Sequence, residues 1–385
     1  MFSVISSGMV AVMTQNIGAG RPGVAYQARQ LGLAFNAVLG VIMSLFLSLG
    51  AGTILSGVGV ADALMQPART YLQIVGGFCI LNALIPICSS YLRAFGFSKE
   101  PLYASIIGNV INFCLNAFFL FVLHKGVAGV ATATVISRII NLVIVVLLGA
   151  VLVKAKQHPE RESNRAVMGQ IIRIGLPSAC ETAIYNVSMT LVIRFLNQMD
   201  AQGLNVTARS YTMQITNFSY CVGAALAQAN AIMTGWHIGA KEYDACDRGT
   251  KKAAVIGVIV AVILETVFTL CSGWIMQLFS KDPQMVSLVG KLLAIDIVLE
   301  IGRVTNLVYG QALKTSGDAV FPVVMGACFM ILCSVGGTYL FGIRLGLLAV
   351  GAYIGMTGDE CVRAVGMYLR WKSGKWKEKG LVKSR

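Results

Sequence analysis

The chain has 385 residues, of which 56% are hydrophobic and only 12% are charged. Soluble domains carry about 25% charged residues, so this composition excludes an ordinary soluble protein and indicates a membrane protein. The formal net charge of +14 would suit a nucleic-acid partner, but the placement of the cations along the chain argues against one.

Apolar segments of membrane-spanning length follow one another along the chain. Residues 1–14 look like the end of a helix too short to span alone, and a polar loop is expected from Gln15 to Arg29. Complete spans are expected at 30–58, 70–92, 102–123, 127–153, 170–196, 205–234, 252–279, 286–312, 320–342 and 346–369. The sequence therefore predicts an all-α polytopic membrane protein with ten complete transmembrane helices and a partial one.

Lysines and arginines concentrate in alternate loops and in the C-terminal tail, residues 370–385. Cytoplasmic loops of membrane proteins are enriched in these residues. Placing the tail in the cytoplasm leaves few loop cations on the opposite side: Arg69, Lys125, Lys281 and Arg344. We therefore expect a multi-pass protein of the cell membrane with a cytoplasmic C-terminus, embedded in the lipid bilayer and without a nucleic-acid partner.

Short motifs recur at an offset of 221 residues. The tripeptide Ile-Gly-Ala at 17–19 returns at 238–240, and the pattern Leu-(Arg/Lys)-x-x-Gly-x-x-x-x-Pro at 92–101 returns at 313–322. Each pair lies on the same predicted side of the membrane, which indicates two parallel halves with an even number of spans each. In transporters built this way, the substrate site lies between the halves.

The repeat divides the chain into four parts. Residues 1–153 form an N-lobe that lacks its first helix and most of its second, and residues 154–169 form a cytoplasmic linker. Residues 170–369 form a C-lobe with six transmembrane helices, followed by the basic tail at 370–385. We expect the N-lobe to be truncated because the gene model starts late.

With these features the sequence resembles the multidrug and toxic compound extrusion (MATE) family over essentially its whole length. The resemblance rests on Gln-Asn-Ile-Gly-Ala-Gly-Arg-Pro at 15–22, Gly-Leu-Pro-Ser at 175–178, Ile-Gly-Ala-Lys at 238–241 and Asp-Glu-Cys-Val-Arg at 359–363, with further stretches at 101–112, 126–138 and 370–376. It implies twelve helices in two six-helix lobes around a central cleft. It also implies an antiporter that exchanges inward Na⁺ or H⁺ for the export of small organic, often cationic, drugs or toxic compounds.

No enzyme motif accompanies this resemblance. The sequence has no H-E-x-x-H set and no serine-based catalytic motif, and its histidines and cysteines lack metal-ligand spacing. We therefore expect no catalytic residues, no bound metal and no cofactor other than the transported Na⁺ or H⁺. The protein is expected to act as a monomer.

Ionisable residues on one face of an apolar helix are the strongest local signal of function. Asp296, Glu300 and Arg303 stand at i, i+4 and i+7. Charges at membrane depth are costly and usually face a cavity and one another. Arg303 is also expected to face the substrate cleft.

The resemblance implies further cation-coupling positions. Asn112 and Asn116 match a polar pair of the N-lobe, although many members have Asp at the second position. Glu181 matches a C-lobe glutamate, and the acid on the later helix is matched by Glu300 or Asp296. We expect the coupling ion to bind Glu181 together with one of these two.

Other conspicuous residues divide between the cleft and the protein framework. Glu265 is interpreted as a structural acid, and Asp359, Glu360 and Arg363 as a structural cluster. Aromatic, thioether and polar side chains repack around varied ligands and hold cations over their rings. The residues expected to line the substrate cleft in this way are Tyr185, Met189, Arg209, Tyr211, Asn217 and Tyr220.

Two alternative functions remain open from the sequence. A flippase of lipid-linked saccharides would need a cationic cleft for pyrophosphate, for which Arg138, Arg194, Arg209 and Arg303 are available. A non-transporting truncated remnant is the other alternative, because the first helices of the N-lobe are missing.

Overall fold

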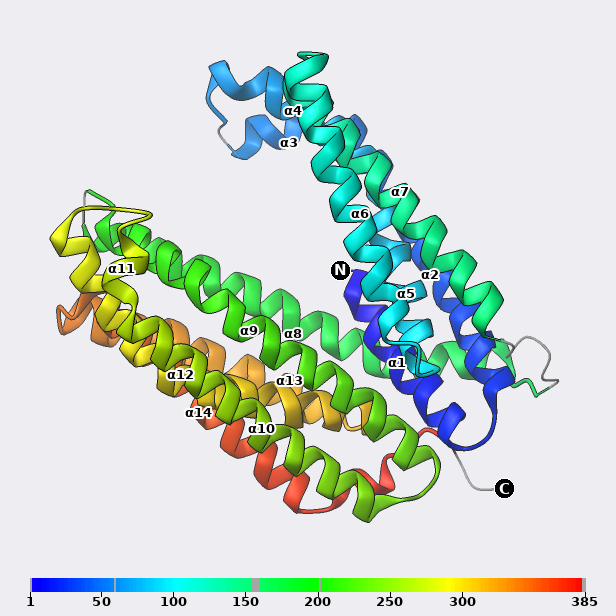
Figure 1. The fold of residues 1–385 in the computed structure, drawn as a ribbon. Coiled ribbons are helices and arrows are strands. Elements are labelled where there is room, and N and C mark those ends of the chain that lie inside the picture. The colour runs from blue at the N-terminus through cyan, green and yellow to red at the C-terminus, as the bar shows by residue number, and fades with distance from the viewer. Residues whose placement is uncertain (1, 59, 154–159, 201, 383–385) are drawn as a thin grey trace. The chain divides into compact units, whose positions relative to one another are not determined.

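The computed structural model describes residues 2–58, 60–153, 160–200 and 202–382, and within these residues it contains helices and no strands (Figure 1). The chain forms two compact units, Met1–Gly175 and Leu176–Arg385. The all-α fold expected from the sequence is confirmed. Each unit is described by itself below.

The first unit is built around α2. This helix packs against α1, α4 and α5, while α6 packs against α7. The elements are α1 (Phe2–Gly18), α2 (Pro22–Leu49), α3 (Ala51–Val58), α4 (Asp62–Gly77), α5 (Ile80–Ala94), α6 (Lys99–Ala117), the π-helix η1 (Phe118–Val122) and α7 (Gly126–Leu152). Helix α8 (Asn164–Met199) begins in this unit and continues into the second.

The second unit is organised around α12 (Pro283–Ser316), which packs against α9, α10 and α14 (Figure 1). The Asp282 side chain caps this helix by accepting from the Gln284 backbone N–H at 3.0 Å, and Pro283 occupies the first turn. The remaining elements are α9 (Leu204–Gly239), α10 (Tyr243–Leu270), α11 (Ser272–Met276), α13 (Val320–Phe329), the π-helices η3 (Met330–Val335) and η4 (Thr338–Arg344), α14 (Leu348–Lys372) and the 3₁₀ helix η5 (Lys375–Glu378).

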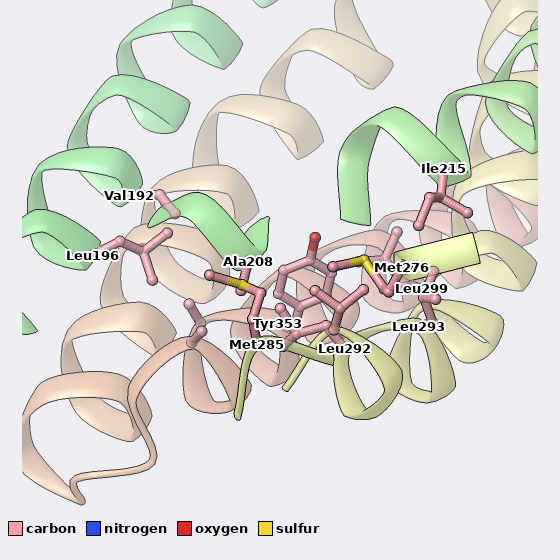
Figure 2. Packing of buried hydrophobic residues seen from close by; sticks show 13 residues of the cluster. Val192, Leu196, Ala208, Ile215, Met276, Met285, Leu292, Leu293, Leu299 and Tyr353 are labelled. Atoms are coloured by element: carbon pink, nitrogen blue, oxygen red, sulfur yellow. The ribbon is translucent and has the colours of Figure 1, made fainter. Parts of the chain in front are cut away.

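One apolar cluster of the second unit joins α8, α9, α11, α12 and α14 (Figure 2). Tyr353 of α14 lies in this cluster and is 2% exposed. Around it pack Leu292 and Leu293 of α12 and Met276 of α11. The cluster fixes the positions of α12 and α14, which carry most of the charged residues described below.

Membrane-spanning length is reached by ten helical segments of the described chain. By length and composition, five can cross a membrane, namely α2, α6 with η1, α7, α10, and α13 through η4; α4 and α5, bent by 42°, together make a sixth. Helices α8, α9, α12 and α14 have 36, 36, 34 and 25 residues, which at about 1.5 Å per residue exceeds the roughly 30 Å hydrocarbon thickness. Of these four, α9, α12 and α14 carry buried charged residues, among them Arg209, Asp296 and Asp359.

The prediction of a polar loop at 15–29 is wrong. Helix α1 continues to Gly18 and α2 begins at Pro22, so only three residues connect them. Gln15 is fully buried, and Gln27 donates from Nε2 to the Glu162 carbonyl at 2.7 Å. The polar residues of this stretch therefore lie mostly in helices, where their side chains are buried or hydrogen-bonded inside the unit. The first complete span lies at 22–49 instead of 30–58.

The backbone confirms the internal repeat. Gly96 and Gly317 both have positive φ, +89° and +98°, in the turns that end α5 and α12. Glycine is required there because this left-handed conformation closes the C-terminal turn of a helix. The π-helices η1 and η4 occupy corresponding places in the two units, before Gly126 and Gly346 with φ of +51° and +68°.

The segments that follow the two lobes are partly helical or packed. Helix α8 already includes residues 164–169 of the predicted linker, and residues 154–159 lie outside the described chain. In the tail, Trp376 is 1% exposed and stacks on Trp371, with ring centroids 4.1 Å apart and planes 8° apart. The start of the basic tail is therefore packed against the second unit.

Candidate functional site

A cavity of about 220 Å³ lies inside the second unit, lined by charged, aromatic and thioether side chains. Its walls come from α8, α9, α12, η3 and α14. The helical spacing of Arg209, Met213, Thr216 and Tyr220 places them on one face of α9. The other lining residues are Tyr185, Met189, Asn217, Asp296, Arg303, Ser334, Tyr353, Met356, Asp359 and Glu360.

Three carboxylates gather beside this cavity. Glu265 of α10 and Asp296 and Glu300 of α12 each offer an oxygen within 4.8 Å of the others. Glu265 and Glu300 are fully buried and Asp296 is 2% exposed. Asp296 belongs to both the carboxylate cluster and the cavity wall, so the two features are continuous.

The carboxylates have unused hydrogen-bonding capacity. Among the described residues, neither oxygen of Glu265 has a hydrogen-bond partner, and the same holds for Oδ2 of Asp296 and Oε2 of Glu300. Buried polar atoms are normally paired, so these oxygens remain available to a further partner. Carboxylate oxygens are ligands for hard cations and acceptors for protons, so this cluster can hold a metal cation or a proton.

A network of ion pairs forms another part of the cavity wall. Arg303 pairs with Glu300 and lies 3.9 Å from Oε1 of Glu360. Arg363 pairs with Oδ1 of Asp359 at 2.8 Å and with Oε1 of Glu360 at 2.9 Å. The predicted cluster of Asp359, Glu360 and Arg363 is thus present, and two of its members also line the cavity.

The close packing of α12 on α14 holds this network together. A Cβ atom on Gly302 would lie 2.8 Å from the backbone nitrogen of Cys361 and 2.9 Å from the carbonyl carbon of Glu360. Only glycine permits this approach of the two backbones. It brings Glu360 within reach of Arg303 on α12 and of the Asn306 side-chain amide, which donates to Oε2 at 2.9 Å.

Glu265 is the member of the carboxylate cluster that the sequence did not place with Asp296 and Glu300. The sequence interpretation gave it a structural role, as an acid placed by a neighbouring polar helix. The structure brings it to Asp296 and Glu300 from a neighbouring helix. Its isolation within an apolar span was the available signal, since such residues are rarely without a function.

Glu181 lies apart from this cluster. Its Oε2 is 2.5 Å from Nζ of Lys314, near the end of α12, and its Cγ faces Gly326 of α13. It is absent from both the carboxylate cluster and the cavity wall. In the first unit, the Asn116 amide donates to Oδ1 of Asn112 at 3.1 Å, so this predicted pair forms with no acid in it.

Most of the predicted cleft residues line the cavity. Tyr185, Met189, Arg209, Asn217, Tyr220 and Arg303 do so. Tyr211 does not, because its ring packs against Phe279 with centroids 5.3 Å apart. Tyr353 and Met356 were not foreseen, although their helical spacing with Glu360 on α14 was visible in the sequence.

The membrane-length helices, with a charged cavity inside the second unit, are those of a polytopic membrane protein. A model of the MatE family matches residues 1–118 and 177–340. The chain is 32% identical to the uncharacterized transporter YisQ of Bacillus subtilis, over 99% of this chain and 85% of that protein. The chain therefore belongs to the MatE family, and the family resemblance seen in the sequence is confirmed.

Other similar proteins agree with this assignment. The chain is 21% identical to a probable multidrug resistance protein NorM of Thermotoga maritima, over 98% of this chain and 82% of that protein. The fold matches a MATE crystal structure in a straight conformation with a TM-score of 0.89, covering 98% of this chain and 85% of that one at 19% identity. At that identity the likeness concerns the fold.

Proposed function

We propose that the protein is a multidrug exporter driven by Na⁺ or H⁺, with the coupling ion bound by Glu265, Asp296 and Glu300. The observation that supports this proposal is the group of unpaired carboxylate oxygens that adjoins the cavity through Asp296. The relatives named as multidrug resistance proteins support the substrate class.

Electrostatics gives the cluster a reason to bind a cation. Two carboxylates 4.8 Å apart repel by roughly 3.5 kcal/mol at an effective dielectric constant of about 20. Arg303 offsets part of this repulsion through Glu300, but it does not pair with Glu265. A bound Na⁺ or proton removes the remaining repulsion, which supplies a driving force for occupancy.

Arg303 offers a route from the ion to the substrate. It contacts Glu300 in the cluster and Glu360 in the cavity wall, and its guanidinium lies 5.9 Å from the centre of the Tyr220 ring. A cation that engages Glu300 competes with Arg303, so Arg303 shifts toward the cavity. Ion and substrate then bias the same group, which is the requirement for coupled binding.

The test is gradient-driven dye efflux from proteoliposomes under separately imposed Na⁺ and H⁺ gradients. Glu265→Gln keeps the shape and removes a charge, so we expect at least a tenfold loss of coupled efflux with folded protein retained. Glu181→Gln is the matched control, because it neutralises a glutamate outside the cluster. Equal efflux by the parental protein and Glu265→Gln, or loss confined to Glu181→Gln, would refute this site.

Related properties are part of the same proposal. The protein acts as a monomer without catalytic activity or a bound cofactor, and its C-terminus is cytoplasmic, as the distribution of cations supports. The flippase alternative is less well supported, because Arg303 is paired with acids and Arg194 is exposed on α8 outside the cavity. Of the four arginines named for this alternative, only Arg209 and Arg303 line the cavity, and two cations of which one is paired with acids are a weaker site for a pyrophosphate than a cluster of cations.

A further inference from the structure

The cavity contains two arginines in different electrostatic situations. Arg303 pairs with Glu300 and approaches Glu360. Arg209 has no ion pair with any described residue, although it is only 7% exposed. Its Nε is buried without a hydrogen-bond partner, and its Nη2 faces Sδ of Met189 at 3.6 Å.

A buried guanidinium normally requires an anion. Removing a charge from water is costly unless it is paired, and a thioether sulfur is only a weak hydrogen-bond acceptor. Of the acids that line the cavity, Asp359 and Glu360 pair with Arg363, and Asp296 lies beside Glu265 and Glu300 and forms no ion pair with Arg209. Arg209 on α9 is therefore a buried cation without an ion-pair partner among the described residues, in a cavity whose lining also carries the acids Asp296, Asp359 and Glu360.

We propose that Arg209 binds a carboxylate of the transported molecule. A planar guanidinium forms two parallel hydrogen bonds with a carboxylate, so an arginine binds a carboxylate more specifically than the point charge of a lysine does. Tyr185, Met189 and Tyr220, in the same cavity, provide aromatic and thioether surface for an apolar body. The substrates are thus aromatic acids or zwitterions, a narrower class than the organic compounds implied by the family resemblance and a different one from its cations; this inference rests on the proposed export function.

A matched pair of dyes tests the proposal by equilibrium binding to the full chain in lipid nanodiscs. One probe is a xanthene dye with a free carboxylate, and the other is its methyl ester. We expect the parental protein to prefer the acid, and Arg209→Gln to weaken binding of the acid at least tenfold with binding of the ester unchanged. Arg209→Lys should retain part of the preference for the acid over the ester, because lysine keeps the positive charge but cannot form the two parallel hydrogen bonds.

Arg194→Gln is the matched control, because Arg194 is an exposed arginine on α8 that does not line the cavity. Thermal unfolding of each variant establishes that it is folded. Equal loss of both dyes in Arg209→Gln, unchanged binding of the acid, or no binding of the acid by the parental protein would overturn the proposal.

This assay separates the two proposals because it needs no ion gradient. Carboxylate-selective binding combined with normal coupled efflux by Glu265→Gln would support the role of Arg209 and refute the coupling site. Loss of coupled efflux by Glu265→Gln combined with equal binding of both dyes would support the coupling site and refute the role of Arg209.

Discussion

The contact between α12 and α14 at Gly302 can be tested with a single methyl group. In Gly302→Ala the new Cβ would lie 2.8 Å from the Cys361 nitrogen and 2.9 Å from the Glu360 carbonyl carbon, both backbone atoms. Ordinary van der Waals contact begins at 3.4 Å, so α14 must move by several tenths of an ångström or more. Overpacking of this kind costs about 1–3 kcal/mol.

The higher helix propensity of alanine opposes this loss of stability, so a control glycine without close neighbours is needed. Replacing glycine by alanine within a helix stabilises by roughly 0.5–1 kcal/mol, which applies equally to Gly358 on α14. A Cβ on Gly358 would meet nothing within 4 Å. We therefore expect Gly358→Ala to be as stable as the parental protein or slightly more stable, and Gly302→Ala to be less stable by about 1–2 kcal/mol.

The measurement is thermal unfolding of both variants in the same nanodiscs, together with coupled dye efflux. Gly302→Ala should also lower efflux, because displacement of Glu360 separates it from Arg303 and from the Asn306 amide. A Gly302→Ala protein at least as stable as Gly358→Ala, with parental efflux, would show that the backbone contact does not hold the site together.

Two further predictions concern the connection between α8 and α9 and the C-terminal tail. The Asp200 carboxylate accepts from the backbone of Leu204 and Asn205, and although burial raises its pKa, these hydrogen bonds outweigh burial and lower it. Asp200→Ala should cost about 1 kcal/mol at neutral pH. Because the pKa of Asp200 is lower in the folded state than in the unfolded state, the stability difference between the parental protein and Asp200→Ala should be fully present above the unfolded-state pKa. It should vanish as the pH falls through the folded-state pKa. A difference in unfolding temperature that does not depend on pH would contradict this prediction. Trp376→Ala should release the tail, because the indole stacks on Trp371 and donates from Nε1 to the Trp371 carbonyl at 2.9 Å. We expect faster tryptic cleavage after Lys375 and Lys377 with the rest of the chain intact; unchanged cleavage would contradict the packed tail.

Much of the fold could be predicted because the bilayer imposes long apolar helices. Segments such as 102–123 and 320–342 agree with α6–η1 and α13–η4 to within a few residues. The repeat was readable because Gly96 and Gly317 occupy a left-handed position that other residues rarely adopt. Helix existence and repeat symmetry are local properties, so a single chain reports them.

Boundaries at polar residues could not be predicted in this way. Gln15 and Gln27 were assigned to a loop, yet both are buried in helices, and Gln27 binds the Glu162 carbonyl from a distant part of the chain. A polar side chain in a membrane helix depends on its partner, and the partner is set by tertiary packing.

The candidate site shows the same division. Asp296, Glu300 and Arg303 were recognisable because one helix face carries all of them at helical spacing. The approach of Glu265 to Asp296 and Glu300 depended on the packing of α10 against α12. The sequence likewise presented Arg209 and Arg303 as equivalent cations. The packing of α12 on α14 placed Glu360 beside Arg303, whereas Arg209 on α9 has no ion pair with the described residues. These pairings depend on distances between helices that are far apart in the chain.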